Sequence, residues 1–432
     1  MSTPAPPRRP YRALSHRDFR RFWTAQFVSL VGTQMQVAAI DWHVYLLTGS
    51  PLALGFVGLV RVIPIVLFSL WGGVVADRYE RRRVMLVTQV LMALAALALG
   101  TLTLRGQESL FVLYALTALG AAANAFDSPA RQALVPSLVP RADLPGALSL
   151  NLTMFHGAMI GGPALAGLVI AGSAGHGATL PLALIYLGNA ASFFAVVFVL
   201  LALPARPQAA GAPGAEAHPL NALREGLRFV FTTPIMVWTM VLDFVATFFS
   251  GANSLLPIFA DQVLHVGPAG FGWLRAAPGL GALCGSLVLS ARALKPRQGP
   301  TFLGAVAAYG LATIVFGLSR NVVLTFVALA AAGLADLVST VVRQTLRQLI
   351  TPDALRGRMT SVNMIFFMGG PQLGELEAGF VAWLFAPVAL GATVSVVSGG
   401  VLTVLVAAFV AARARVVREY DVSKHVVEDT GP

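Results

Sequence analysis

Residues 55–83 read GFVGLVRVIPIVLFSLWGGVVADRYERRR, an apolar run that holds one arginine and ends in a basic cluster. At 1.5 Å of helix per residue, the apolar part is long enough to cross a bilayer core of roughly 30 Å. Backbone amides find no water partners in hydrocarbon, so a run of this kind must be helical. The stretch therefore predicts a transmembrane helix followed by a charged loop.

The same pattern recurs along the chain of 432 residues, of which 56% are hydrophobic and 11% are charged. Soluble domains usually carry about 25% charged residues, and the alternation typical of barrel strands is absent. We therefore predict an all-α membrane protein with twelve transmembrane helices. The predicted spans are 22–47, 53–76, 84–104, 109–126, 147–172, 180–203, 236–259, 270–290, 300–319, 322–342, 361–385 and 388–412.

The formal net charge of +11 raises the question of a nucleic-acid partner. The basic residues, however, lie in short clusters between apolar runs, and nearly all fall on one side of the predicted membrane. The opposite side receives only Arg105 and Arg320. By the positive-inside rule both termini are cytoplasmic. We expect a multi-pass protein of the bacterial inner membrane, surrounded by lipid and without nucleic acid.

The spans divide into two six-helix bundles, 22–203 and 236–412, with cytoplasmic tails at 1–21 and 413–432. The linker 204–235 begins rich in Pro, Ala and Gly, which is typical of a flexible tether. Its later part has apolar residues at helical spacing, which predicts an amphipathic helix on the cytoplasmic face.

Two short patterns occur once in each predicted bundle. Arg-x-x-Pro occurs at 61–64 in the second span and at 275–278 in the eighth. Gly-Gly-Pro occurs at 161–163 in the fifth span and at 369–371 in the eleventh. Both pairs lie six spans apart and in the same order, which indicates a duplicated six-helix unit. Such repeats are typical of secondary transporters.

The loop at 73–83 reads GVVADRYERRR and resembles the signature loop of the major facilitator superfamily, with Glu80 in place of a glycine. The resemblance implies that superfamily's fold. It also implies that Asp77 forms a cytoplasmic charge latch with Arg78 and Arg81. A carboxylate beside arginines and a helix start is physically favourable. A plain positive-inside loop is the alternative.

The fifth span reads GAMIGGPALAG at 157–167 and resembles the antiporter motif of the same superfamily, with Ala166 in place of a glycine. Gly162 and Gly167 would allow close helix contact, and Pro163 would bend the helix. Ordinary helix packing is the alternative interpretation of this segment.

Four further segments resemble the enterobactin-exporter-like branch: LTGS at 47–50, PARQALVP at 129–136, LLPIFA at 255–260 and QLGELEAG at 372–379. Members of this branch are exporters or efflux pumps. The resemblance therefore implies proton-driven extrusion of a small molecule, without naming the substrate.

Ionisable residues inside spans cost about 2.5–3.5 kcal/mol or more unless they are paired or hydrated. Asp41 and Arg61 lie at similar depths, so an ion pair between them is possible. Arg275 is a further intramembrane charge, expected as a neighbour of one of the two glutamates of the eleventh span. Glu375 and Glu377 diverge by about 200° around one helix. We predict that one of these two glutamates, or Asp41, carries the coupled proton. A structural role for each is the alternative.

Other polar positions receive weaker assignments. Asp243 and Asp336 lie toward the cytoplasmic side, where gating or helix-end solvation is expected. Residues expected to line the cavity are Gln34, Asn189, Asn253 and Asn363.

These features predict a secondary active transporter that exports amphipathic small molecules, such as drugs or siderophores, by alternating access and proton coupling. An importer of a polar nutrient and a non-transporting membrane partner are the alternatives. The sequence has no catalytic triad, metal-ligand cluster or Walker phosphate loop, and its single cysteine is Cys284. We therefore expect no enzyme activity, no metal and no cofactor, and we expect a monomer.

Overall fold

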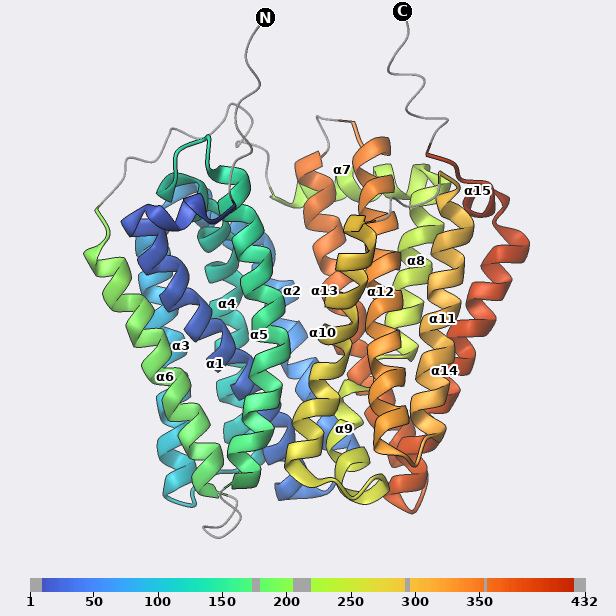
Figure 1. Ribbon diagram of the computed structural model, residues 1–432, viewed down its shortest axis with the longest axis horizontal. Helices are drawn as coiled ribbons and strands as arrows, with labels where there is room; N and C mark the ends of the chain where they lie inside the picture. Colours follow the sequence, from blue (N-terminus) through green and yellow to red (C-terminus); the bar gives the residue numbers. More distant parts are fainter. Residues whose placement is uncertain (1–9, 173–178, 205–218, 292–295, 353–355, 423–432) are drawn as a thin grey trace, which may run out of the picture. The chain divides into compact units, whose positions relative to one another are not determined.

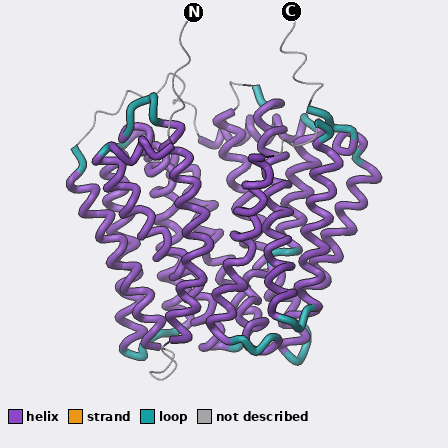
Figure 2. Tube along the Cα trace, in the orientation of Figure 1, coloured by secondary structure: helices purple, strands orange, loops and turns teal. Residues whose placement is uncertain are grey.

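The computed structural model describes residues 10–172, 179–204, 219–291, 296–352 and 356–422. Within these ranges the side chains of 70, 77, 219–223, 226 and 356–368 are outside the description. Over this part of the chain all regular structure is helical (Figure 2). The all-α class is therefore confirmed for the described residues.

The chain forms two compact units. Unit 1 comprises Met1–Ile40 with Ile63–Glu216, and unit 2 comprises Asp41–Val62 with Ala217–Pro432. The hairpin 41–62, which joins the first two long helices, thus belongs to unit 2 although it lies in the first half of the sequence. The bundle boundaries predicted above stay a prediction.

Unit 1 is built from long helices that pack side by side (Figure 1). Helix α3 packs between α6 and α4, and the short 3-10 helix η1 packs on α5. The elements are η1 (Pro10–Ser15), α1 (Arg17–Thr48), α2 (Pro51–Arg78), α3 (Arg81–Leu104), α4 (Leu110–Leu138), α5 (Leu144–Gly172) and α6 (Thr179–Ala202). The ends of α1 and α2 that meet at the hairpin belong to unit 2.

Unit 2 has α11 packed between α12 and α14, with α10 on α12 and α13 on α8 (Figure 1). The first two helices of unit 2 after the linker are α7 (Pro219–Thr232) and α8 (Pro234–Phe249). The other elements are η2 (Ala252–Leu255), α9 (Leu256–Ile258), η3 (Phe259–Val263), α10 (Gly267–Ala291), α11 (Gln298–Leu318), α12 (Val322–Ile350), α13 (Arg356–Trp383), α14 (Val388–Arg413) and α15 (Arg415–Arg418). Helix α7 occupies the segment whose pattern predicts an amphipathic helix.

Three predicted spans differ from the observed helices. The tenth span was predicted to end at 342, whereas α12 continues to Ile350. The fourth span was predicted to end at 126, whereas α4 continues to Leu138 through Pro129 and Pro136. Such prolines are tolerated in membrane helices when neighbouring groups satisfy the freed backbone. The span predicted over 236–259 lies within one candidate membrane span, Pro234–Val263, but its α-helix is interrupted, because α8 stops at Phe249.

The backbone that follows α8 lies close to α13. A Cβ atom on Gly251 would lie 3.1 Å from the carbonyl oxygen of Pro371 and 3.3 Å from the carbonyl carbon of Gly374, both in α13. The backbone after α8 therefore passes so close to α13 that only glycine fits without a shift. The chain then continues through 3-10, α and π turns to Val263.

Ten helical segments of the described chain are long and apolar enough to cross a membrane. The interrupted segment Pro234–Val263 counts as one of them. Helices α1 and α13 are not among the ten. Helix α1 carries Gln34, Gln36, Asp41 and His43 within its apolar stretch, and these polar side chains lower its hydropathy. The number of twelve spans and the cytoplasmic termini stay predictions.

Candidate functional site

A buried cluster of charges lies in unit 2, centred on Asp41 of α1. Asp41 is only 2% exposed. Arg61 of α2 donates a hydrogen bond from Nη2 to Asp41 Oδ1 over 3.1 Å. Arg275 of α10 places Nη1 2.5 Å from Asp41 Oδ2. The two arginines of the repeated Arg-x-x-Pro pattern therefore pair with the same carboxylate.

Glu375 of α13 completes this cluster. It is 6% exposed and interacts electrostatically with Arg61, Arg275 and Asp41. A Cβ atom on Gly58 of α2 would lie 2.9 Å from Glu375 Oε2, and one on Gly55 would lie 2.8 Å from the Glu375 carbonyl oxygen. Glycine at these two positions thus lets the α2 backbone press against α13 around the carboxylate.

The four groups balance when all are ionised, with two arginines against two carboxylates. Removing charges from water costs several kcal/mol per ion, and only good mutual pairing offsets that cost. A proton on Glu375 would leave one positive charge in excess. The arrangement can therefore respond to protonation at Glu375 by a change of one unit in its net charge.

Polar and aromatic contacts continue along the same end of α1. Tyr45 donates a hydrogen bond to Asp261 Oδ2 over 2.5 Å and accepts one from Gln262 Nε2 over 3.2 Å. Trp42 packs against Phe271 of α10, with ring centroids 5.3 Å apart. Asp261 and Gln262 belong to the π turn η3, an irregularity that is frequent at functional sites.

Glu377 stands apart from the charge cluster. Its Oε2 atom is buried and has no hydrogen-bond partner among the described residues. None of the four clustered charges is among the groups that act on its carboxyl. The structure thus separates the two glutamates, as their divergence around the helix predicts.

The predicted cytoplasmic latch is described only in part. Arg81 donates from Nη1 to the carbonyl oxygen of Ala133 over 2.8 Å, which joins the start of α3 to α4. The side chain of Arg78 is exposed, and that of Asp77 lies outside the described residues. Arg82, which the sequence analysis did not single out, donates to the carbonyl oxygen of Leu200 near the end of α6 over 2.7 Å.

The antiporter-like segment is a close helix contact inside unit 1. A Cβ atom on Gly162 would lie 3.0 Å from the carbonyl oxygen of Val31 and would also collide with Gln34. Pro163 and Gly167 are buried in the same helix, α5. Gln34 is therefore a packing neighbour of α5 as well as a cavity candidate.

The other cavity candidates lie in different surroundings. Asn189 is buried and donates from Nδ2 to Gln36 Oε1 over 2.7 Å, so its side chain is engaged within unit 1. Asn253 is exposed on η2. The side chain of Asn363 lies outside the described residues.

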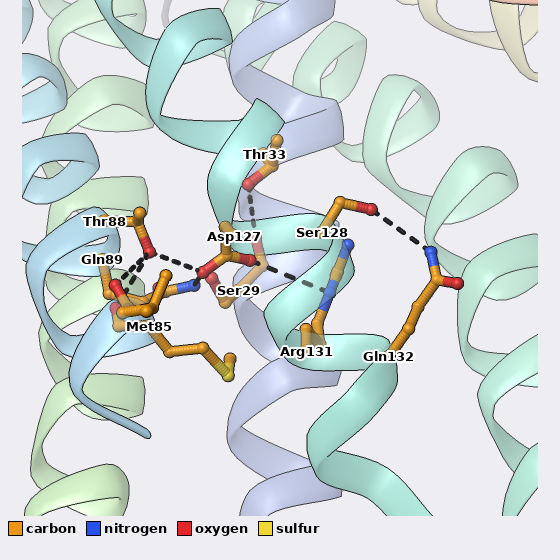
Figure 3. A network of polar contacts seen from close by, with 10 residues as sticks. Ser29, Thr33, Met85, Thr88, Gln89, Asp127, Ser128, Arg131 and Gln132 are labelled. Carbon is orange, nitrogen blue, oxygen red and sulfur yellow. Dashed lines mark hydrogen bonds and ion pairs between the residues drawn. The ribbon is translucent and has the colours of Figure 1, made fainter. Parts of the chain in front are cut away.

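Sequence reasoning missed a polar network around Asp127 in α4 (Figure 3). Gln89 of α3 donates from Nε2 to Asp127 Oδ1 over 3.0 Å, and the Thr88 hydroxyl donates to the same oxygen over 2.9 Å. Arg131 lies one turn further along α4, with Nε 3.8 Å from Asp127 Oδ2. Ser29 of α1 lies beside this network (Figure 3). Asp127 is 2% exposed, so its charge is satisfied inside the bundle.

A second cluster of charged side chains, which the sequence analysis did not predict, joins α8 to α12 in unit 2. Arg343 forms an ion pair from Nη1 to Asp243 Oδ2, and both side chains are largely buried. Asp336, on α12, interacts electrostatically with Arg343 and with Asp243. The sequence had assigned these aspartates to gating or to solvated helix ends. The repeated Arg-Gln-x-Leu at 131–134 and 343–346 is the signal that marks both clusters.

The chain matches the family model of transmembrane secretion effectors over residues 8–429. It is 30% identical over 377 residues to the enterobactin exporter EntS of Shigella boydii serotype 18, which covers 87% of this chain and 88% of that protein. The same figures hold for the enterobactin exporter EntS of Escherichia coli O1:K1.

Solved structures share the fold. A bacterial homologue of the human lysosomal transporter Spinster aligns with a TM-score of 0.73 and 14% identity, over 99% of this chain and 100% of that one. A bacterial homologue of the iron transporter ferroportin aligns with a TM-score of 0.65 and 18% identity, over 90% and 98%.

These relatives are transporters, and the sequence relatives are bacterial exporters. The resemblance to the enterobactin-exporter-like branch is confirmed. The chain therefore belongs to the transmembrane secretion effector family of the major facilitator superfamily, and it is a multi-pass small-molecule transporter of the bacterial cell membrane rather than an enzyme.

Proposed function

We propose that the protein exports amphipathic small molecules, siderophores among them, in exchange for protons. The relatives named as enterobactin exporters support the direction and the substrate class. In this proposal twelve helices cross the membrane with both termini in the cytoplasm, and a monomer works by alternating access.

The cluster of Asp41, Arg61, Arg275 and Glu375 carries the proposal, because it is charge-balanced and contains a buried acid. It joins the α1–α2 hairpin to α10 and α13 inside unit 2. Protonation of Glu375 removes one attraction for the arginines and leaves an unbalanced positive charge. The hairpin then separates more easily from α13, and this separation opens the path by which substrate leaves.

The remaining predicted groups have supporting roles in this cycle. Asp77, Arg78 and Arg81 form the latch that stabilises one conformation at the cytoplasmic side. Gly162 and Pro163 give α5 the close packing and the bend that an antiporter helix needs.

The test uses proteoliposomes loaded with iron-free enterobactin as the probe and placed in a more acidic medium. The wild-type protein should release enterobactin faster with the proton gradient than without it. Glu375→Gln should lose this acceleration while it still exchanges enterobactin at equal pH, because glutamine keeps the packing but cannot titrate.

Glu377→Gln is the matched control, since it makes the same change two residues along α13, outside the charge cluster. It should keep the acceleration by the gradient. If gradient-driven release survives both substitutions unchanged, proton coupling through these glutamates is refuted.

A further inference from the structure

The buried charges between α8 and α12 do not balance. Asp243 and Arg343 form an ion pair that joins the two helices. Asp336 belongs to the same electrostatic group, yet it has no ion pair or hydrogen bond of its own among the described residues. Two carboxylates therefore share one guanidinium group.

Neighbouring groups do not supply the missing positive charge. Among the described residues, Arg343 is the cation that acts on Asp336, and Asp243 repels it. Arg347 lies eleven residues beyond Asp336, about 16 Å along the helix axis at 1.5 Å per residue. Helix α11 contributes Tyr309, which interacts with both aspartates but carries no positive charge.

Helix α10, which also packs on α12, carries Arg275 and Cys284. Arg275 is paired with Asp41, and Cys284 is exposed. Neither group offsets the second carboxylate. If both aspartates were ionised, the cluster would keep one uncompensated negative charge inside a membrane-spanning bundle, which costs several kcal/mol.

The position of Asp336 in α12 can be compared with the corresponding position of α4 in the first half of the sequence. Helices α4 and α12 have the same length of 29 residues. Ser109 and Asn321 cap their N-termini, and Arg131 and Arg343 stand at the same distance from these caps. In this register Asp336 corresponds to Asn124, a neutral residue of nearly the same shape. At the position of Asp336, the first half thus has a neutral side chain in place of the carboxylate.

We propose that Asp336 binds a proton and forms a second proton site, separate from Glu375. The proton comes from solvent and converts the carboxylate into a carboxylic acid. With Asp336 neutral, Arg343 is free to pair with Asp243 alone. When Asp336 releases its proton, it competes with Asp243 for Arg343 and weakens the contact between α8 and α12. The part of this proposal that concerns transport rests on the proposed function.

The presence of the proton can be tested without transport. Infrared difference spectra of the full-length protein in proteoliposomes, recorded between mildly acidic and mildly alkaline buffer, report the carbonyl band of a protonated carboxylic acid. Asp336→Asn should remove one such band from the wild-type spectrum. Asp243→Asn should remove it too, because Arg343 then pairs with Asp336 and keeps it ionised.

Two further variants make the result decisive. Glu419→Gln changes an exposed carboxylate next to Arg415 and should leave the spectrum unchanged. Asp336→Glu should retain a carboxylic acid band, which separates loss of the proton from loss of the fold. A wild-type band that persists in both Asp336→Asn and Asp243→Asn would overturn the proposal.

The coupling of Asp336 to transport is tested separately, by measuring enterobactin release. If gradient-driven enterobactin release fails in the wild-type protein, the proposed function fails, and the infrared result still decides whether Asp336 holds a proton. If the wild-type release is gradient-driven, Asp336→Asn should alter its pH profile while Asp336→Glu restores it. An unchanged pH profile in Asp336→Asn would refute the coupling of this site.

Discussion

Helices α4 and α12 occupy equivalent places in the two halves of the sequence, and each has an arginine followed by Gln-x-Leu. Around Arg131 the carboxylate is Asp127, on the same helix, and two hydrogen bonds tie it to α3. Around Arg343 the carboxylate is Asp243, on a different helix, and Ser339 stands where α4 has Asp127. The two arginines thus stand at matching positions, but one pairs with an acid on its own helix and the other with an acid on a different helix.

This difference has a mechanical consequence. In unit 1 the arginine can lose its partner without separating two helices, because hydrogen bonds to Thr88 and Gln89 hold α4 against α3. In unit 2 the ion pair itself joins α8 to α12. A change of protonation should therefore alter helix contacts in unit 2 more than in unit 1.

The largest expected effect is the difference in lost stability between substitution of Arg343 and substitution of Arg131. Arg343→Gln leaves Asp243 and Asp336 without their cation and should destabilise the protein by about 3–5 kcal/mol, because it leaves uncompensated buried charge. Arg131→Gln should cost about 1 kcal/mol or less, because its ion pair is long and the arginine side chain is 21% exposed. Denaturant unfolding in detergent measures both variants, and equal losses would refute the asymmetry between the halves.

An intermediate loss of stability is expected when the side-chain hydrogen bonds of the two clusters are removed. Gln89→Leu removes a donor to the buried Asp127 carboxylate and should cost about 1.5–3 kcal/mol, as expected for a bond to a charged group. In the other half Arg343 donates from Nε to Ser339 Oγ over 3.3 Å. Ser339→Ala should cost only about 0.5–1.5 kcal/mol. The same unfolding experiment ranks the two, and a larger loss for Ser339→Ala would reverse our interpretation.

The smallest effect is expected when Asn124 of α4 is replaced by aspartate, the residue at the corresponding position of α12. Asn124 is exposed, whereas Asp336 is partly buried. Asn124→Asp should therefore change stability by no more than about 0.5 kcal/mol, as is usual for surface substitutions, and should add no carboxylic acid band to the infrared spectrum. A new band in this variant would show that position in the repeat, rather than burial beside an arginine, determines protonation.

The sequence predicts the helical class, most spans and the duplicated unit, because apolar length and repeated prolines are local features. It also marks Asp41, Arg61, Arg275 and Glu375 as unusual charges. The approach of Arg275 to Asp41 depends on how α10 packs against the α1–α2 hairpin, and no local pattern reports that contact. The pairing of both repeated arginines with one acid therefore needed the structure.

Two other features were hidden for different reasons. The fourth span was predicted too short, because the helix continues past Asp127 and Pro129 and a side chain of α3 satisfies the acid. After the break at Phe249 the backbone passes close to α13 at Gly251. Hydropathy carries no information about such a contact.

Proton exchange is the central claim, and the most direct test records both fluxes in the same vesicles. Proteoliposomes are loaded with iron-free enterobactin and a pH-sensitive dye, and the medium is acidified. We predict that protons enter together with enterobactin release, and that proton entry stops when enterobactin is omitted. Enterobactin release at an undiminished rate without accompanying proton entry would contradict the account.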